Sequence, residues 1–196
     1  MISYFSKIIA SFFYQRKIIS KNELTVCEYG FELIISTAIG FGLVLISGIV
    51  FNELLSVILF YAVFVCFRFF TGGYHATTHL RCKIVLLICC LFVLINVKYW
   101  SNDKCFSLII ALQLFYLITV IIFSPVEHIN IPLTNELKIK NRKISIIMAI
   151  AIMPLSLWTA LCFLKVSLVI SWTLFVIAIL IIIIPKIQER RRISHE

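Results

Sequence analysis

Six long apolar blocks divide the chain, and this pattern limits its fold more than any other feature. The blocks run over roughly residues 30–51, 54–70, 83–100, 105–123, 144–164 and 166–185. An α-helix needs about 20 apolar residues to cross the hydrocarbon of a bilayer, so each block can cross once, although 54–70 is near the lower limit. Hydrophobic residues make up 62% of the chain and charged residues only 14%, which excludes an ordinary soluble domain. We predict an all-α, polytopic integral membrane protein with about six transmembrane helices, forming a single domain over residues 1–196.

The two ends of the chain differ from the six blocks. Residues 1–29 begin with an amphipathic pattern that is too short and too interrupted to span, so we expect an interfacial amphipathic helix there. Its apolar positions at helical spacing are Ile2, Phe5, Ile8, Ile9, Phe12 and Ile19. Residues 186–196 contain Lys186, Arg190, Arg191 and Arg192, which predicts a basic tail.

Basic residues are divided unevenly between the two ends of the predicted spans. Fifteen of the 18 Lys and Arg residues fall on the side that holds both termini, and only Lys98, Lys104 and Lys165 fall on the other. Lys and Arg favour the cytoplasmic side of a membrane protein. We therefore expect a multi-pass protein of the bacterial cell membrane, with both termini and residues 71–83 in the cytoplasm.

The formal net charge of +9 does not require a nucleic-acid partner. The basic residues lie beside predicted span ends, where anionic lipid headgroups attract them. The lipid bilayer is therefore the expected partner of these charges. Ser36 and Gly40, four residues apart in the first block, permit close helix packing, and a homodimer through that face is the less favoured interpretation.

The segment TGGYHATTHLRCK, residues 71–83, is the most polar stretch between two apolar blocks. A cysteine attacks as its thiolate, which a neighbouring histidine, a basic residue or a helix N-terminus stabilises. Thr77 or Thr78 is a suitable N-cap, so Cys82 is predicted in about the first turn of the third span. Arg81 and Lys83 flank this thiol, which favours Cys82 as a nucleophile.

Two histidines compete for the role of the base. His79 lies three residues before Cys82, so the two share a face of a regular helix. His75 lies seven residues before Cys82, about 10.5 Å along a continuous helix, and needs a bend such as Gly72-Gly73 permits. Spacing alone slightly favours His79.

Two other interpretations of this segment are open from the residues alone. His75, His79 and Cys82 could hold a zinc ion as three N/S ligands on one helix face, although a glycine pair and two threonines make a poor rigid helix start. The segment could also be a polar loop with incidental histidines. We favour neither and expect no metal and no cofactor.

The same residues resemble a known family. Arg68, Gly73, His75 and Cys82 match the Arg, Gly, His and Cys pattern of the accessory gene regulator B (AgrB) proteins, which are membrane cysteine endopeptidases of bacterial quorum sensing. The segment SPVEHINIPLT resembles the Pro-rich loop of that family, and the basic stretch 138–143 follows it. The resemblance extends over nearly the whole chain.

The resemblance implies roles for these residues. Cys82 would be the nucleophile and His75 the base, which reverses the preference for His79, and Arg68 and Gly73 would support the site. The substrate would be an AgrD-like precursor peptide, cut on the C-terminal side of the future ring and closed to a thiolactone through an acyl-enzyme. An acidic peptide tail would find complementary charge at Arg81, Lys83, Lys138, Lys140, Arg142 and Lys143.

A small membrane transporter or peptide exporter without covalent catalysis is the alternative class. Such a protein is expected to carry ionisable residues in the middle of its spans. Glu32 and Lys98 lie near the ends of their blocks, and the centres carry almost none, so the sequence favours the enzyme.

Overall fold

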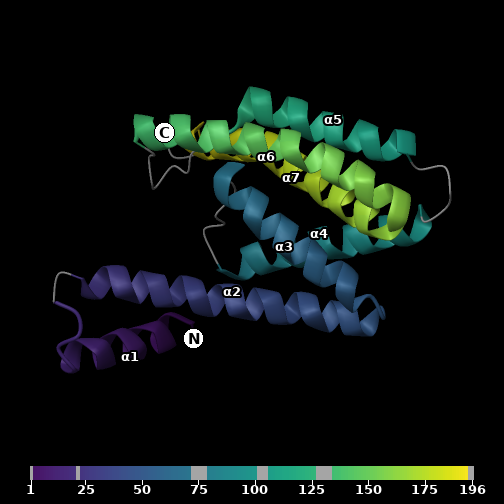
Figure 1. Ribbon diagram of the computed structural model, residues 1–196. Coiled ribbons are helices and arrows are strands. Elements are labelled where there is room, and N and C mark those ends of the chain that lie inside the picture. Colours follow the sequence, from purple (N-terminus) through teal and green to yellow (C-terminus); the bar gives the residue numbers. More distant parts are fainter. Residues whose placement is uncertain (1, 21–22, 72–78, 101–105, 127–133, 194–196) are drawn as a thin grey trace.

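The computed structural model describes residues 2–20, 23–71, 79–100, 106–126 and 134–193, and in these ranges the chain forms seven helices and no strand (Figure 1). Six of the helices are long and apolar enough to cross a membrane. This confirms the predicted all-α, polytopic fold with six spans. The helices are α1 (Ile2–Gln15), α2 (Leu24–Val50), α3 (Leu54–Thr71), α4 (His79–Tyr99), α5 (Phe106–Phe123), α6 (Asn135–Cys162) and α7 (Leu164–Ile193).

Helix α2 begins six residues before the predicted span, at Leu24 instead of residue 30. The N–H and hydroxyl of Ser20 both donate to the Glu23 carboxylate, at 2.8 Å each. A Ser followed three residues later by a Glu is the sequence pattern of a helix start, in which the carboxylate reaches back to the preceding backbone. These two hydrogen bonds lower the pKa of Glu23 below its ordinary value.

Helix α6 also begins earlier than predicted, at Asn135 instead of residue 144. The prediction that residues 138–143 lie in a loop is therefore wrong, because they form early turns of α6. Glu136 lies in the first turn, where the helix dipole favours negative charge, and Thr134 accepts the first backbone hydrogen bond from Lys138. In the same way, the expected tail after residue 185 continues the helix of α7 to Ile193.

Helix α7 forms the centre of the bundle. It packs against α3, α4, α5 and α6, and 67% of its membrane-crossing stretch is buried inside the protein. Leu168, Leu174, Ile177 and Ile181 on this helix are almost completely enclosed. A helix that is apolar all round is suited to such a position, because every face meets another helix.

Helices α1 and α2 lie at the edge of the bundle, side by side and antiparallel (Figure 1). On α1, Ser6 and Ala10 are buried, and Phe13 contacts Phe31 of α2 with 5.5 Å between ring centroids. Another face of α1 exposes Phe5, Ile8 and Phe12. The amphipathic helix is thus present, and its location in the membrane interface stays a prediction.

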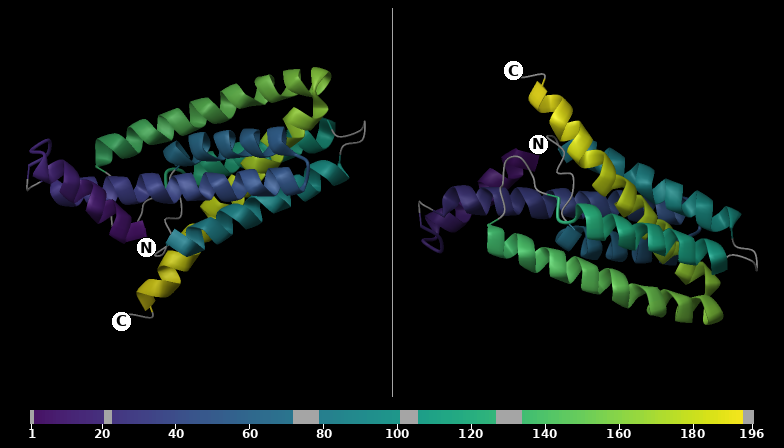
Figure 2. Two further views of the ribbon diagram at one scale, coloured as in Figure 1. Left: turned by 90° about the horizontal axis from the view of Figure 1, so that it is seen from below. Right: turned by 90° about the horizontal axis from the view of Figure 1, so that it is seen from above.

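The connections between helices gather at two ends of the bundle. The α2–α3 hairpin, the end of α4, the start of α5 and the α6–α7 junction lie at one end, and the end of α3 and the starts of α4 and α6 lie at the other (Figure 1). The last turns of α7 extend beyond the bundle at this second end (Figure 2). The second end therefore carries those of the described residues of α3, α4, α6 and α7 that were predicted to be cytoplasmic.

Candidate active site

The end of α3 is fixed to the end of α5. Thr71 is fully buried, and its carbonyl oxygen accepts hydrogen bonds from the N–H of Val126 at 3.0 Å and from the hydroxyl of Ser124 at 3.4 Å. The Ser124–Pro125 peptide bond is cis. The two hydrogen bonds to the Thr71 carbonyl hold the last turn of α3, where Arg68 lies, against the end of α5.

Arg68 lies in the last turn of α3 and is partly buried. Its guanidinium stacks over the ring of Phe64, with 5.1 Å between the guanidinium carbon and the ring centroid. The guanidinium also lies close enough to the thiols of Cys82 and Cys89 to interact with them electrostatically. The two cysteines are seven residues apart, so one face of α4 turns both of them toward α3.

Cys82 is the fourth residue of α4 and therefore lies in its first turn, where the sequence predicted it. Its side chain is half-buried and forms no disulfide. A helix N-terminus and a nearby guanidinium both stabilise negative charge on sulfur. The described part of the site thus combines a partly accessible thiol with two sources of positive potential.

Tyr61 is a neighbour of Cys82 that sequence reasoning missed. It lies on α3, near enough to Cys82 that a tyrosinate and a thiolate would repel each other, and its hydroxyl donates a hydrogen bond to the carbonyl oxygen of Thr37 on α2 at 3.3 Å. Its ring contacts Phe41 with 4.8 Å between centroids. The sequence offered only a weak indication of this residue, because Tyr61 lies within an apolar run. Its spacing of seven residues from Arg68 puts the two on one face of a helix.

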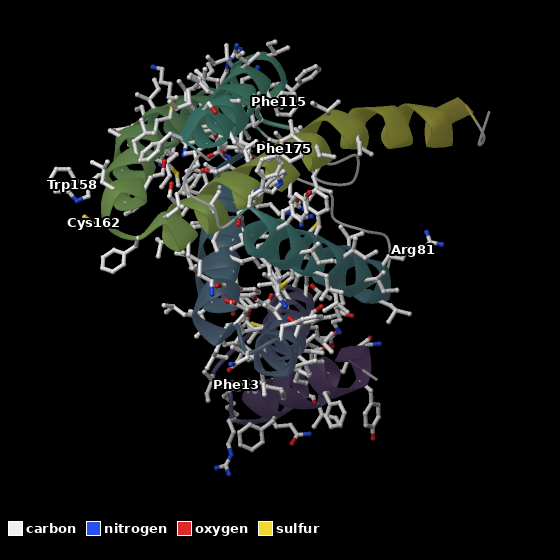
Figure 3. The ribbon with its side chains drawn as sticks, turned by 90° about the vertical axis from the view of Figure 1, so that its right-hand side faces the viewer. Phe13, Arg81, Phe115, Trp158, Cys162 and Phe175 are labelled. Atoms are coloured by element: carbon white, nitrogen blue, oxygen red, sulfur yellow. The ribbon has the colours of Figure 1, made fainter. Side chains whose placement is uncertain are left out.

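The other predicted site residues are placed as follows. Gly73 and His75 lie outside the described residues. His79 is the first residue of α4, and its side chain lies outside the described part. Arg81 is exposed and points away from the bundle (Figure 3), whereas Lys83 is half-buried.

The basic residues of α6 are all exposed, but they do not share one face. Lys138 and Arg142 are four residues apart and continue the line of the buried residues Ser145 and Ala149. The Arg142 guanidinium donates to the carbonyl oxygen of Ile121 on α5 at 3.2 Å. Lys140 and Lys143, three residues apart, lie on the far side of the helix.

Gly40, which was predicted to permit close packing, does so within the chain. A methyl group at this position would lie 3.3 Å from Cδ2 of Leu86, so α2 and α4 approach closely there. A homodimer through Ser36 and Gly40 stays a prediction.

The fold and this arrangement define a class: a multi-pass membrane protein with a cysteine at a helix N-terminus, close to a partly buried arginine on the neighbouring helix. The family profile of Accessory gene regulator B (AgrB) matches residues 6–192, so the chain belongs to the AgrB family. Membership indicates a role in processing the agr quorum-sensing peptide, with an AgrD-like precursor as partner.

Two relatives from Clostridium perfringens (strain 13 / Type A) are similar to this chain. AgrB-like protein 1 is 35% identical over 144 residues, which cover 70% of this chain and 72% of the relative. AgrB-like protein 2 is 28% identical over 149 residues, which cover 73% of this chain and 69% of the relative. No solved structure matches the chain.

Proposed function

We propose that this protein is a membrane-embedded cysteine endopeptidase that cuts an AgrD-like precursor and closes the product to a thiolactone. The observation that supports it most is the position of Cys82, in the first turn of α4 and within electrostatic range of Arg68. The family gives the substrate class, and the geometry gives a half-buried thiol at a helix start beside a guanidinium.

In the proposed first step, the Cys82 thiolate attacks the scissile carbonyl carbon of the precursor. A carbon–sulfur bond forms, the peptide C–N bond breaks, and His75 protonates the leaving amine. The N-terminal part of the precursor is then held as a thioester on Cys82. His75 has this role by the family resemblance, with His79 as the alternative base.

In the proposed second step, the thiolate of the precursor's own cysteine attacks this thioester. The new thioester closes the ring, and Cys82 leaves as a thiolate. One thioester replaces another, so the step is close to isoenergetic and needs no outside energy source. Hydrolysis would waste the intermediate, so the proposed mechanism requires that water be kept from the thioester.

Arg68 is proposed to support the site by its charge, and the exposed basic residues to bind the acidic tail of the precursor. Arg81 projects from the start of α4, and Lys138, Lys140, Arg142 and Lys143 surround the start of α6. We further propose that this end of the bundle faces the cytoplasm, because it carries most of the Lys and Arg residues.

The test is cleavage of a synthetic precursor by purified protein in lipid vesicles. Cys82→Ser and His75→Ala are each expected to lower the rate by on the order of 10³-fold or more. Cys66→Ser, which changes an exposed thiol on α3, is the matched control and should keep full activity. Full activity of Cys82→Ser would refute the proposal, and full activity of His79→Ala would remove His79 as a base.

A further inference from the structure

A cluster of polar side chains lies inside the bundle, toward the end where α5 and α7 begin and α6 ends. Gln113 of α5 donates through its amide nitrogen to the hydroxyl oxygens of Ser156 on α6 and Ser171 on α7, the latter at 3.0 Å. All three side chains are at most 1% exposed. Together with Tyr116 and Ser167 they form what we call the polar seam.

The hydrogen bonds fix which way the Gln113 amide points. The Ser156 hydroxyl donates its own proton to the carbonyl oxygen of Met153 at 3.1 Å, so its oxygen must accept from Gln113. Both amide protons of Gln113 are then used, one for each serine. Its oxygen Oε1, which can accept two hydrogen bonds, has no donor among the described residues.

Two more polar atoms of the seam are buried without a partner. The hydroxyls of Tyr116 and Ser167 are at most 1% exposed and form no hydrogen bond among the described residues. Tyr116 is three residues after Gln113 on α5, and Ser167 is four residues before Ser171 on α7. At 1.5 Å per residue, Tyr116 lies about 4.5 Å and Ser167 about 6 Å, along the helix axes, from the level where Gln113 meets Ser171. Because α5 and α7 run in the same direction, the two residues lie on opposite sides of that level (Figure 1).

These unpaired atoms are chemically complementary to water. Gln113 Oε1 needs a donor, whereas each hydroxyl can donate as well as accept, and water supplies both functions. An unpaired buried polar group costs about 1–3 kcal/mol, and buried water in proteins typically makes about three hydrogen bonds to such groups. Trp172 Nε1 is also unpaired, but its ring packs against Phe92 of α4 and lies on another side of α7.

We propose that the polar seam is a water-binding site inside the membrane, in which bound waters extend from Gln113 Oε1 to the hydroxyl of Tyr116 on one side and to the hydroxyl of Ser167 on the other. Hydrogen bonds, both direct and through water, then hold α5, α6 and α7 together in addition to their apolar contacts. The inner end of the seam reaches the Tyr116 ring, which contacts Phe67 on α3 with 5.9 Å between centroids, one residue before Arg68.

The test compares the melting temperature of the Tyr116→Phe variant, in detergent or vesicles, with that of the unchanged protein. The control is Tyr99→Phe, which changes an exposed tyrosine. If water bonds to the Tyr116 hydroxyl, its removal is expected to lower the melting temperature by about 2–4 °C relative to the control. If the hydroxyl is dry and unpaired, its removal relieves a cost and raises the melting temperature. A rise or no change would overturn the proposal.

Discussion

Helices α7 and α2 are both long and apolar, but they occupy opposite positions in the bundle. In α7, 67% of the crossing stretch is buried, whereas in α2 the share is 22% and only Gly40, Val44, Ser47 and Gly48 are buried. Apolar composition therefore shows which segments enter the membrane and not which faces meet protein. In a bilayer a lipid-facing residue needs only to be apolar, whereas a protein-facing residue must also fit its neighbours.

The largest effect on stability is expected when a buried residue of α7 is compared with an exposed residue of α2. Ile177→Ala in α7 removes a side chain that is 1% exposed, and Ile34→Ala in α2 removes one that is 64% exposed. The first should leave a cavity and lower the free energy of unfolding by about 2–5 kcal/mol. The second should change it by less than about 0.5 kcal/mol. Equal effects in an unfolding titration would break the comparison.

Two glycines show the same difference between buried and exposed faces within α2 alone. A methyl group at Gly48 would overlap Cγ2 of Val57 and lie 3.2 Å from Cα of Leu54, whereas one at Gly42 would have no neighbour within 4 Å. Gly48 belongs to the α2–α3 hairpin, in which it accepts a backbone hydrogen bond from Glu53 at 2.7 Å.

Gly48→Ala is expected to destabilise the protein by about 1–3 kcal/mol, because stiff Val57 and the backbone must move apart. Gly42→Ala should be neutral or stabilise by up to about 1 kcal/mol, since alanine favours the helix. Unfolding in increasing denaturing detergent measures both. If both variants are equally stable, α2 and α3 do not pack at Gly48 as described.

The same contrast between faces applies to the basic residues of α6. Lys138 continues the protein-facing line of this helix, and Lys140 lies on the far side. Lys138→Glu and Lys140→Glu change the net charge equally. If the acidic tail of the precursor binds the protein-facing side, Lys138→Glu should raise the KM for the precursor about 3- to 10-fold and Lys140→Glu less than 2-fold. A larger effect at Lys140 would place tail binding on the other face.

The smallest effect is expected at the opposite end of the bundle. Glu53 in the α2–α3 hairpin pairs with Lys165 near the start of α7 at 2.5 Å and accepts a hydrogen bond from Ser56 at 2.7 Å. Partial burial raises the pKa of Glu53, but the hydrogen bonds and the positive charges of Lys165 and Lys98 outweigh it and leave the pKa below 4.5. Exposed pairs of this kind contribute about 0.2–1 kcal/mol.

Because the folded protein lowers the pKa of Glu53, its contribution to stability is complete above pH 4.5 and is lost as the pH falls through the lowered value. Glu53→Gln should therefore lower the melting temperature slightly at pH 7, and the deficit should be smaller at pH 3. A melting curve taken at both pH values checks this. A deficit that persisted unchanged at pH 3 would show that the carboxylate charge is not its cause.

The sequence predicted the elements that depend on composition and on local chemistry. The six spans and the N-terminal helix follow from the length and pattern of the apolar segments. The location of Cys82 in a first helical turn follows from the threonines before it that can cap a helix. The early starts of α2 and α6 were missed because polar turns such as residues 135–143 were assigned to loops. The Ser20 and Glu23 pair could have indicated the first of them.

The features that depend on tertiary contacts could not be predicted in this way. Tyr61 approaches Cys82 only because α3 and α4 pack side by side. Gln113 is one amide in an apolar run, and its two serine partners lie 43 and 58 residues away in sequence. Such pairs are set by how helices are oriented, and hydropathy does not contain that information.

The most direct test of the central claim is to trap the acyl-enzyme. A precursor whose ring-forming cysteine is replaced by alanine cannot close the ring, so the proposed thioester should accumulate when hydrolysis is slow. Mass spectrometry of the rapidly quenched protein should find the N-terminal part of the precursor on Cys82, in a bond that hydroxylamine cleaves. An acyl group on another side chain, or cleavage at full rate with no acyl group on Cys82, would contradict the account.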